Sequence, residues 1–247
     1  MTAERPLLEI CVDSVEACVE AERGGADRLE LCAGLVEGGT TPSIGTIGLA
    51  LARVSIPIVV LVRPRRGDFL YSPVELETAA RDVAAAKAAG ATGVALGALR
   101  PDGTVDRRAL ARFCELARPM RVTFHRAFDQ LREPLAELEA LVDLGVDRVL
   151  TSGGAATAPE GAARIAALVR AAGKRITVLA GGGVRPANVR ELVRATGVSE
   201  VHATARELVE SAMEHRNHSV CFDSAPVGAW QLQATHAGCV RALRAEL

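Results

Sequence analysis

Aromatic residues are scarce in this sequence: Phe, Trp and Tyr make up 3% of its 247 residues. The hydrophobic share still reaches 49%, and much of it is Ala, Val and Leu. A core built from such small aliphatic side chains is typical of helices packed around a parallel sheet. Single α/β barrels are commonly roughly 250 residues long. Composition and length together predict an α/β protein with one domain over residues 1–247.

An excess of charge of one sign is also missing. The chain carries 29 Lys and Arg against 30 Asp and Glu, a formal net charge of −1. It has no basic block with interleaved aromatic residues, which argues against a nucleic-acid partner. The N-terminal stretch lacks the regions of a signal peptide, and no apolar run approaches the ~18 residues that span a bilayer. We therefore expect a cytoplasmic protein with no membrane association.

Paired cysteine motifs of the CxxC type are absent as well. In a cytoplasmic chain this argues against a disulfide framework. We expect most of the cysteines to behave as small buried hydrophobic residues. The six cysteines are Cys11, Cys18, Cys32, Cys114, Cys221 and Cys239.

Strand-like and helix-like segments alternate along the whole chain. Ala-, Glu- and Arg-rich stretches with helical spacing, such as 74–89 and 159–172, separate short apolar runs. This alternation predicts parallel strands joined by crossover helices. The expected strands are 7–11, 28–32, 58–63, 93–97, 121–125, 148–152, 176–181 and 200–204.

A glycine repeat indicates how the sheet closes. Gly25, Gly90, Gly145 and Gly197 each stand shortly before every second expected strand. Each glycine suits a left-handed turn at the end of a helix. The repeat therefore marks four βαβα units and predicts a closed (β/α)8 barrel of the TIM type. An open doubly wound sheet would not explain why a glycine precedes every second strand.

Strand parity predicts which side chains face the barrel lumen. In the second strand Leu29 and Leu31 should face the helices, so that their neighbours point inward. Aligning the even strands from their glycines gives three layers of four side chains. The expected layers are Arg28, Gly93, Arg148 and Glu200 at the bottom, Glu30, Ala95, Leu150 and His202 in the middle, and Cys32, Gly97, Ser152 and Thr204 at the top. These layers place ions where an ordinary barrel has Val, Ile and Leu, and a buried ion needs a partner.

The C-terminal region has a less regular pattern. Residues 213–223 are expected to form a loop, and 229–246 are expected to form a final helix that closes the ring. We find no linker and no second domain in the pattern.

The C-terminal ends of the strands form the active face of such barrels. Arginines in 63–71 and glycine-rich stretches after the sixth and seventh strands are candidate anion ligands there. A solvated loop and tight βα turns are the alternative interpretations. The candidate anion-binding residues are Arg63, Arg65, Ser152, Gly153, Gly181, Gly182 and Gly183.

Two histidines and two cysteines are expected at the same face. His125 and His202 share it with Glu9 and Glu30, which suits acid–base or metal chemistry, although a buried histidine can simply be a satisfied core residue. Cys11 and Cys32 end neighbouring strands with inward parity. Two thiolates at the ends of neighbouring strands are close enough to hold a soft ion such as Cu(I). The alternative interpretation is that both residues are simply buried thiols.

Several long motifs resemble the CutC family of copper homeostasis proteins, over residues 7–240. The resemblance implies a TIM-type barrel, a cytoplasmic location and self-association as a homo-oligomer. It also implies that Cys11 and Cys32 are metal ligands for copper. The motifs are LLEICVDSVEA, GGADRLELCAGLVEGGTTPS, VRPRRGDFLYS, VTFHRAFDQ, RVLTSGG, AGGGVRPANV and EVHAT.

Two functions are therefore expected, and both can hold for one chain; a scaffold without a small-molecule site would leave the residues at this face unexplained. The leading hypothesis is Cu(I) binding in copper homeostasis. The alternative is a lyase or isomerase acting on a small phosphorylated or carboxylated metabolite, because copper carriage does not require the arginines and histidines of this face. In that case the glycine loop and Arg63 hold the anion, Glu30 or His125 moves a proton, and Arg126 or His202 stabilises negative charge. The candidate catalytic residues are Glu9, Glu30, Arg63, His125, Arg126 and His202.

Overall fold

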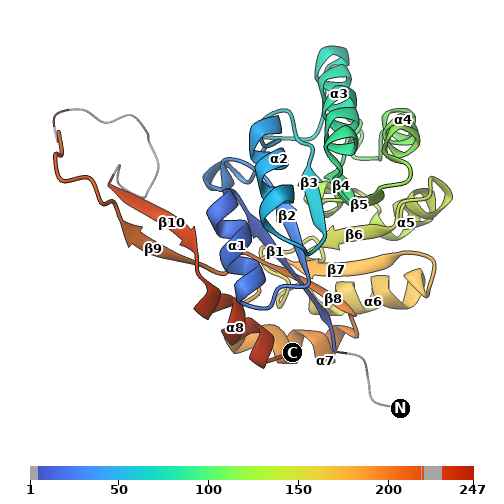
Figure 1. The fold of residues 1–247 in the computed structure, drawn as a ribbon. Coiled ribbons are helices and arrows are strands. Elements are labelled where there is room, and N and C mark those ends of the chain that lie inside the picture. The colour runs from blue at the N-terminus through green and yellow to red at the C-terminus, as the bar shows by residue number, and fades with distance from the viewer. Residues whose placement is uncertain (1–4, 218, 220–229) are drawn as a thin grey trace.

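Eight parallel strands close into a barrel in the computed structural model of this chain, which describes residues 5–217, 219 and 230–247 (Figure 1). Neighbours in the barrel follow the order of the sequence, from β1 through β8 and back to β1. This confirms the predicted (β/α)8 barrel. The barrel strands are β1 Leu7–Val12, β2 Arg28–Leu31, β3 Ile58–Leu61, β4 Gly93–Leu96, β5 Arg121–Phe124, β6 Arg148–Thr151, β7 Thr177–Gly181 and β8 Glu200–Ala203.

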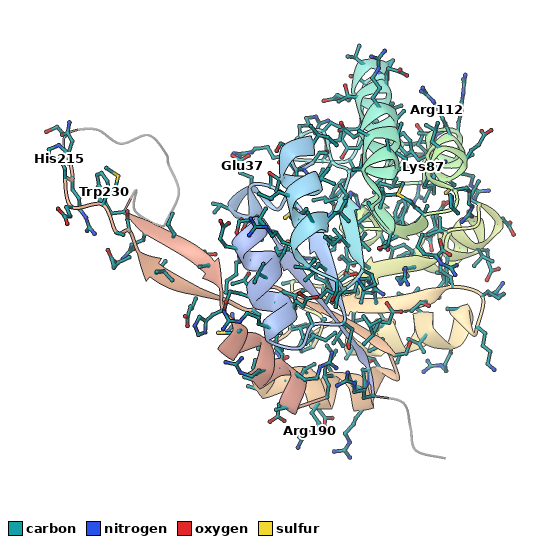
Figure 2. All side chains as sticks on the ribbon, viewed as in Figure 1. Glu37, Lys87, Arg112, Arg190, His215 and Trp230 are labelled. Atoms are coloured by element: carbon teal, nitrogen blue, oxygen red, sulfur yellow. The ribbon has the colours of Figure 1, made fainter. Side chains whose placement is uncertain are left out.

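Within the described residues, eight α-helices accompany the barrel. The first seven each lie between two consecutive barrel strands in the sequence. The outer faces of the helices are charged: Figure 2 shows Lys87, Arg112 and Arg190 on this exposed surface. Among the described residues no helix is long and apolar enough to cross a membrane. The helices are α1 Val15–Arg23, α2 Ile44–Arg53, α3 Pro73–Ala89, α4 Arg107–Ala117, α5 Pro134–Asp143, α6 Ala162–Ala172, α7 Pro186–Thr196 and α8 Ala237–Ala245.

The helix ends form where the sequence provides the right residues. Ser72 caps the start of α3, and Glu75 completes a capping box with it. Gly90 and Gly197 end α3 and α7 in the left-handed conformation, which glycine adopts without a Cβ penalty. All four glycines of the repeat have positive φ, between 72° and 96°. The glycine repeat thus turns the chain from helix back into strand, as predicted.

Strand register confirms the expected division of side chains. Leu29 and Leu31 pack into the large core between barrel and helices, whereas Cys11, Cys32 and Ala95 belong to a small cluster with Val59 and Leu61. The small cluster consists of the inward positions of β1–β4 and the residue after β2. The lumen therefore contains few aliphatic side chains, which leaves room for charged ones.

The bottom of the lumen holds a network of ion pairs. Arg28 donates from Nε to Glu9 at 2.5 Å and also pairs with Glu200. Arg148 completes the network, with Nε 3.1 Å from Glu200 Oε2. Each charge of this network therefore has a partner, which is the condition for ions to persist in a dry interior.

The C-terminal region departs from the prediction. Residues 231–235, expected to be helical, form strand β10 (Gln231–Thr235), which pairs antiparallel with β9 (Arg206–Glu210). The hairpin projects from the barrel in Figure 1. Helix α8 starts only at Ala237, where the His236 ring accepts a hydrogen bond from the Gly238 amide. The expected helix over 229–246 is wrong in its first part because pairing with β9 supplies the backbone hydrogen bonds there.

The rest of that region is covered only in part. Residues 213–217 and 219 contain no helix or strand, which agrees with the expected loop over 213–223. His218 and 220–223, including Cys221, lie outside the described residues. The irregular C-terminal segment is thus partly an ordered hairpin.

Candidate functional site

A cavity of about 1010 Å³ opens at the C-terminal end of the barrel strands. Side chains from six of the eight strands, or from the residue or two after them, line its wall. Cys11 and Glu30 come from inside β1 and β2, and Arg63 and His125 follow β3 and β5. The predicted site residues on the lining are Cys11, Glu30, Arg63, His125, Arg126, Gly182, Gly183 and His202.

The two predicted thiol ligands meet at one side of this cavity. Cys11 Sγ lies 3.8 Å from Cys32 Sγ. Cys11 lines the cavity, whereas Cys32 is fully buried and is 3.3 Å from the carbonyl oxygen of Val12. The hydrogen bond with Cys32, burial and the Glu30 carboxylate raise the pKa of Cys11 well above its usual value. Without a cation, Cys11 is therefore a neutral thiol.

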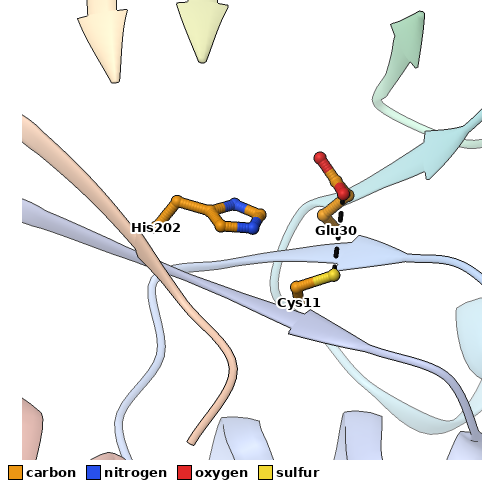
Figure 3. Close-up of side chains that lie close together, drawn as sticks. All are labelled: Cys11, Glu30 and His202. Carbon is orange, nitrogen blue, oxygen red and sulfur yellow. Dashed lines mark hydrogen bonds between the residues drawn. The ribbon is translucent and has the colours of Figure 1, made fainter. Parts of the chain in front are cut away.

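A carboxylate and an imidazole converge on the same thiol. One ligand atom each from Cys11, Glu30 and His202 lie within 4.8 Å of one another, and all three residues are buried (Figure 3). The Cys11 thiol is 3.6 Å from Glu30 Oε1. Together with Cys32 this is a set of two sulfur ligands and one imidazole, and these ligand types suit Cu(I). The donor set therefore fits the copper ion that the sequence predicts.

The network below holds His202 in place. His202 Nδ1 is 2.7 Å from Glu9 Oε1, which leaves Nε2 to face the site. Burial alone would lower the pKa of His202, but hydrogen bonds to Cys11 and Glu9 and the nearby carboxylates raise it well above 6.5. Burial would raise the pKa of Glu9, but the Arg28 charge and His202 lower it to about 2. A carboxylate behind a histidine is the usual support of a metal-binding imidazole.

Arg63 is a buried cation without a carboxylate partner. Its guanidinium donates to backbone carbonyls, at 2.8 Å to Gly39 and 2.8 Å to Gly67. It is 7% exposed, and no described carboxylate lies within ion-pair distance of it. Among the described residues its buried Nε has no hydrogen-bond partner. An anion in the cavity would supply the missing charge.

His125 is the buried residue that ends the fifth strand. Its Nδ1 accepts a hydrogen bond from the Ala127 amide at 3.2 Å, which starts the short 3-10 helix Arg126–Gln130. Burial and the Arg63 charge lower the pKa of His125 to about 3. The imidazole is therefore neutral near pH 7, and its Nε2 has no partner among the described residues.

A second wall of the cavity is organised by Asp129. This carboxylate accepts hydrogen bonds from Arg126 Nε at 2.8 Å and from the Ser152 amide at 3.0 Å. Arg126 also donates to Ser152 Oγ at 2.9 Å and lies against Gly182, where an added Cβ would be 3.3 Å from its guanidinium. Our sequence reasoning missed Asp129 as a site residue. The sequence feature that could have identified it is its position three residues after Arg126.

Some predicted site residues lie elsewhere. Arg65 pairs with Glu75 at 2.6 Å and Asp68 at 2.9 Å and does not line the cavity. Gly153 and Gly181 allow close packing, since an added Cβ would lie 2.5 Å from the Gly161 oxygen and 2.6 Å from Leu150, respectively. The remaining predicted residues that do not line the cavity are Glu9, Cys32 and Ser152, which lie behind its wall.

The structure also brings together a second group of metal-ligand side chains, which the sequence analysis did not predict. Glu207, His236 and Cys239 place one ligand atom each within 4.8 Å of one another at the base of the hairpin. Cys239 also lines the main cavity. The hairpin brings Glu207 to residues 29 or more positions away, and no spacing rule could predict that contact.

Fold and site together define a TIM-type barrel protein with a thiol pair and a cationic cavity at its active face. The chain belongs to the CutC family, whose model matches residues 6–207. A CutC protein of Chromobacterium violaceum is 48% identical over 241 residues, which cover 98% of both chains. The copper homeostasis protein cutC homolog of Homo sapiens is 46% identical over 240 residues, covering 97% of this chain and 88% of that protein.

A solved structure agrees with both fold and family. A CutC protein of Streptococcus agalactiae superposes with a TM-score of 0.77 at 32% identity. The match covers 81% of this chain and 98% of that one. The resemblance that the motifs indicated is thus confirmed at the level of family and architecture.

Proposed function

We propose that this protein binds Cu(I) through Cys11 and Cys32 and serves copper homeostasis in the cytoplasm. The observation that carries the proposal is the 3.8 Å separation of the two sulfur atoms, with Cys11 open to the cavity. Relatives named for copper homeostasis support it.

We also propose that the protein self-associates, as the family resemblance implies. Light scattering that finds only monomer would contradict this proposal.

The surroundings fit the entry and retention of such an ion. Cu(I) reaches the pair from the cavity side, because Cys32 has no exposed surface. Binding displaces the thiol protons, since thiolates are the ligands. His202, oriented by Glu9, presents its other ring nitrogen to Cys11.

Replacing Cys11 and Cys32 together by serine should weaken Cu(I) binding by about a hundredfold or more, because hydroxyl groups are hard, poorly acidic ligands. An anaerobic competition titration against a chromophoric Cu(I) chelator measures the loss. The matched control is Cys18→Ser with Cys114→Ser, which removes two buried thiols far from the cavity lining. Equal Cu(I) affinity in both double variants and the wild type would remove the metal-site proposal.

A second candidate is an enzyme, a lyase or isomerase, that acts on a small phosphorylated or carboxylated metabolite. One observation favours it: Arg63 is buried at the cavity wall with no described carboxylate beside it. A copper carrier has no need for this cation. Glu30, whose Oε2 has no hydrogen-bond partner among the residues that the structure describes, is the candidate proton acceptor.

The second candidate predicts anion binding that depends on one arginine and not on its neighbour. By calorimetry, 2-phosphoglycolate should bind the wild type, and Arg63→Met should lose at least about tenfold in affinity. Arg65→Met is the control, since Arg65 comes from the same loop but pairs with Glu75 outside the cavity. Equal losses in both variants would mean that general surface charge binds the anion.

A further inference from the structure

We propose that the Nε–H of Arg63 and the Nε2–H of His125 form a donor pair that binds one sp² oxygen group, a carboxylate or carbonyl, of a small ligand. The pair deepens the second candidate function and rests on it, because it names the part of the ligand that the cavity recognises. It is independent of copper binding.

The hydrogen bonds of His125 fix its tautomer. Its Nδ1 accepts the Ala127 amide proton, so that nitrogen carries no proton of its own. A neutral imidazole has one N–H, which must then be on Nε2. The low pKa of His125, set by burial and the Arg63 charge, agrees with a neutral ring. His125, which lines the cavity, is therefore a hydrogen-bond donor whose buried Nε2–H has no partner among the described residues.

Arg63 is held by its other nitrogens. Nη1 donates to the carbonyls of Gly38 and Gly39, and Nη2 donates to that of Gly67. These bonds fix the plane of the guanidinium and hence the direction of Nε–H. The Nε atom itself has no hydrogen-bond partner in the part of the chain that the structure describes.

Both unpaired donors belong to the same small region. The guanidinium of Arg63 lies 5.1 Å from the centre of the Phe69 ring, and the His125 ring lies 4.9 Å from it. Gly97, which follows β4 between their strands, makes room for the imidazole: an added Cβ there would be 2.7 Å from the His125 ring. The missing side chain at Gly97 thus lets the His125 ring lie close to the end of β4.

Two buried donors without partners are costly. Each unsatisfied group destabilises the free protein, so a ligand that satisfies both is favoured. One donor is neutral and the other carries a full charge. This combination suits a carboxylate, or a carbonyl whose oxygen gains negative charge during reaction. A neutral histidine donor also avoids giving up its proton to the ligand.

The experiment uses full-length protein with 15N-labelled histidine and 2-phosphoglycolate as the probe. We expect the probe to move the Nε2–H resonance of His125 downfield, whereas inorganic phosphate, which has no carboxylate, leaves it nearly unchanged. Affinity for 2-phosphoglycolate should fall at least about tenfold in His125→Phe and in Arg63→Lys, which keeps the charge but lacks the Nε–H. His125→Gln keeps a side-chain N–H and should recover part of the loss.

The outcomes separate the pair from the function on which it rests. If His125→Phe folds and binds 2-phosphoglycolate as the wild type does, the donor pair is wrong. If the wild type binds inorganic phosphate as tightly as 2-phosphoglycolate, an anion site remains but the pair is again wrong. If neither probe binds the wild type, both proposals fall. Copper affinity should be unchanged in His125→Phe, which also shows that this variant is folded.

Discussion

Replacing Arg28 by methionine should lower the free energy of unfolding by about 3–5 kcal/mol. Arg28 is 4% exposed and pairs with both Glu9 and Glu200 at the bottom of the lumen. Without its charge two carboxylates stay buried with reduced compensation, and breaking such a network is more costly than never building it. Urea unfolding followed by circular dichroism measures the change.

A surface arginine provides the comparison. Arg121 pairs with Asp147 at 2.6 Å, but its side chain is 68% exposed, so Arg121→Met should cost less than about 1 kcal/mol. The Arg28 change should also weaken Cu(I) binding, because Glu9 loses the cation that keeps it ionised beneath His202. Similar small losses for both variants would show that the lumen network is solvated and not buried.

The barrel and its lumen could be predicted because both follow from local rules. A glycine before every second strand locates the units, and parity along each strand decides which side chains point inward. Arg28 and Glu200 are 172 residues apart, yet the glycine alignment and parity together predicted them in one layer, where they pair. The approach of Cys11 to Cys32 followed in the same way from neighbouring parallel strands.

What could not be predicted depends on long-range pairing and on loop geometry. Strands β9 and β10 are each only five residues long, so neither segment predicts the hairpin from its own sequence pattern. Arg63 and Arg65 belong to one loop and share one chemistry. Only the turn decides that Arg65 meets Glu75 while Arg63 faces the cavity. Asp129 was missed because its partners come from the next strand and loop.

His125 shows the same limit for chemistry. The sequence indicated a histidine at a strand end, which suits proton transfer or metal binding equally well. The structure favours a donor role, since the Ala127 amide occupies Nδ1 and burial keeps the ring neutral. A histidine at this position is compatible with several chemical roles, and the hydrogen bonds of His125 in the structure favour one of them.

Acidification from pH 7 to pH 5 should destabilise the wild type by about 2 kcal/mol more than it destabilises His125→Gln. The pKa of His125 is about 3 in the folded protein, against an ordinary value of 6.5 for a solvated histidine. Between these values the unfolded chain binds a proton that the folded protein refuses, so stability falls as the pH falls. Urea unfolding of both proteins at several pH values gives the difference.

Neither Glu9 nor His202 produces this difference. Glu9 has a lowered pKa, and its contribution is lost only as the pH falls below about 4.5 toward 2, outside the window. His202 has a raised pKa, so its contribution is complete below 6.5 and declines as the pH rises. Both groups are present in the wild type and in His125→Gln, and their effects cancel in the comparison. Equal pH slopes in the two proteins would mean that folded His125 takes up a proton near pH 6, and a protonated ring could not keep Nδ1 as the acceptor that holds the Ala127 amide.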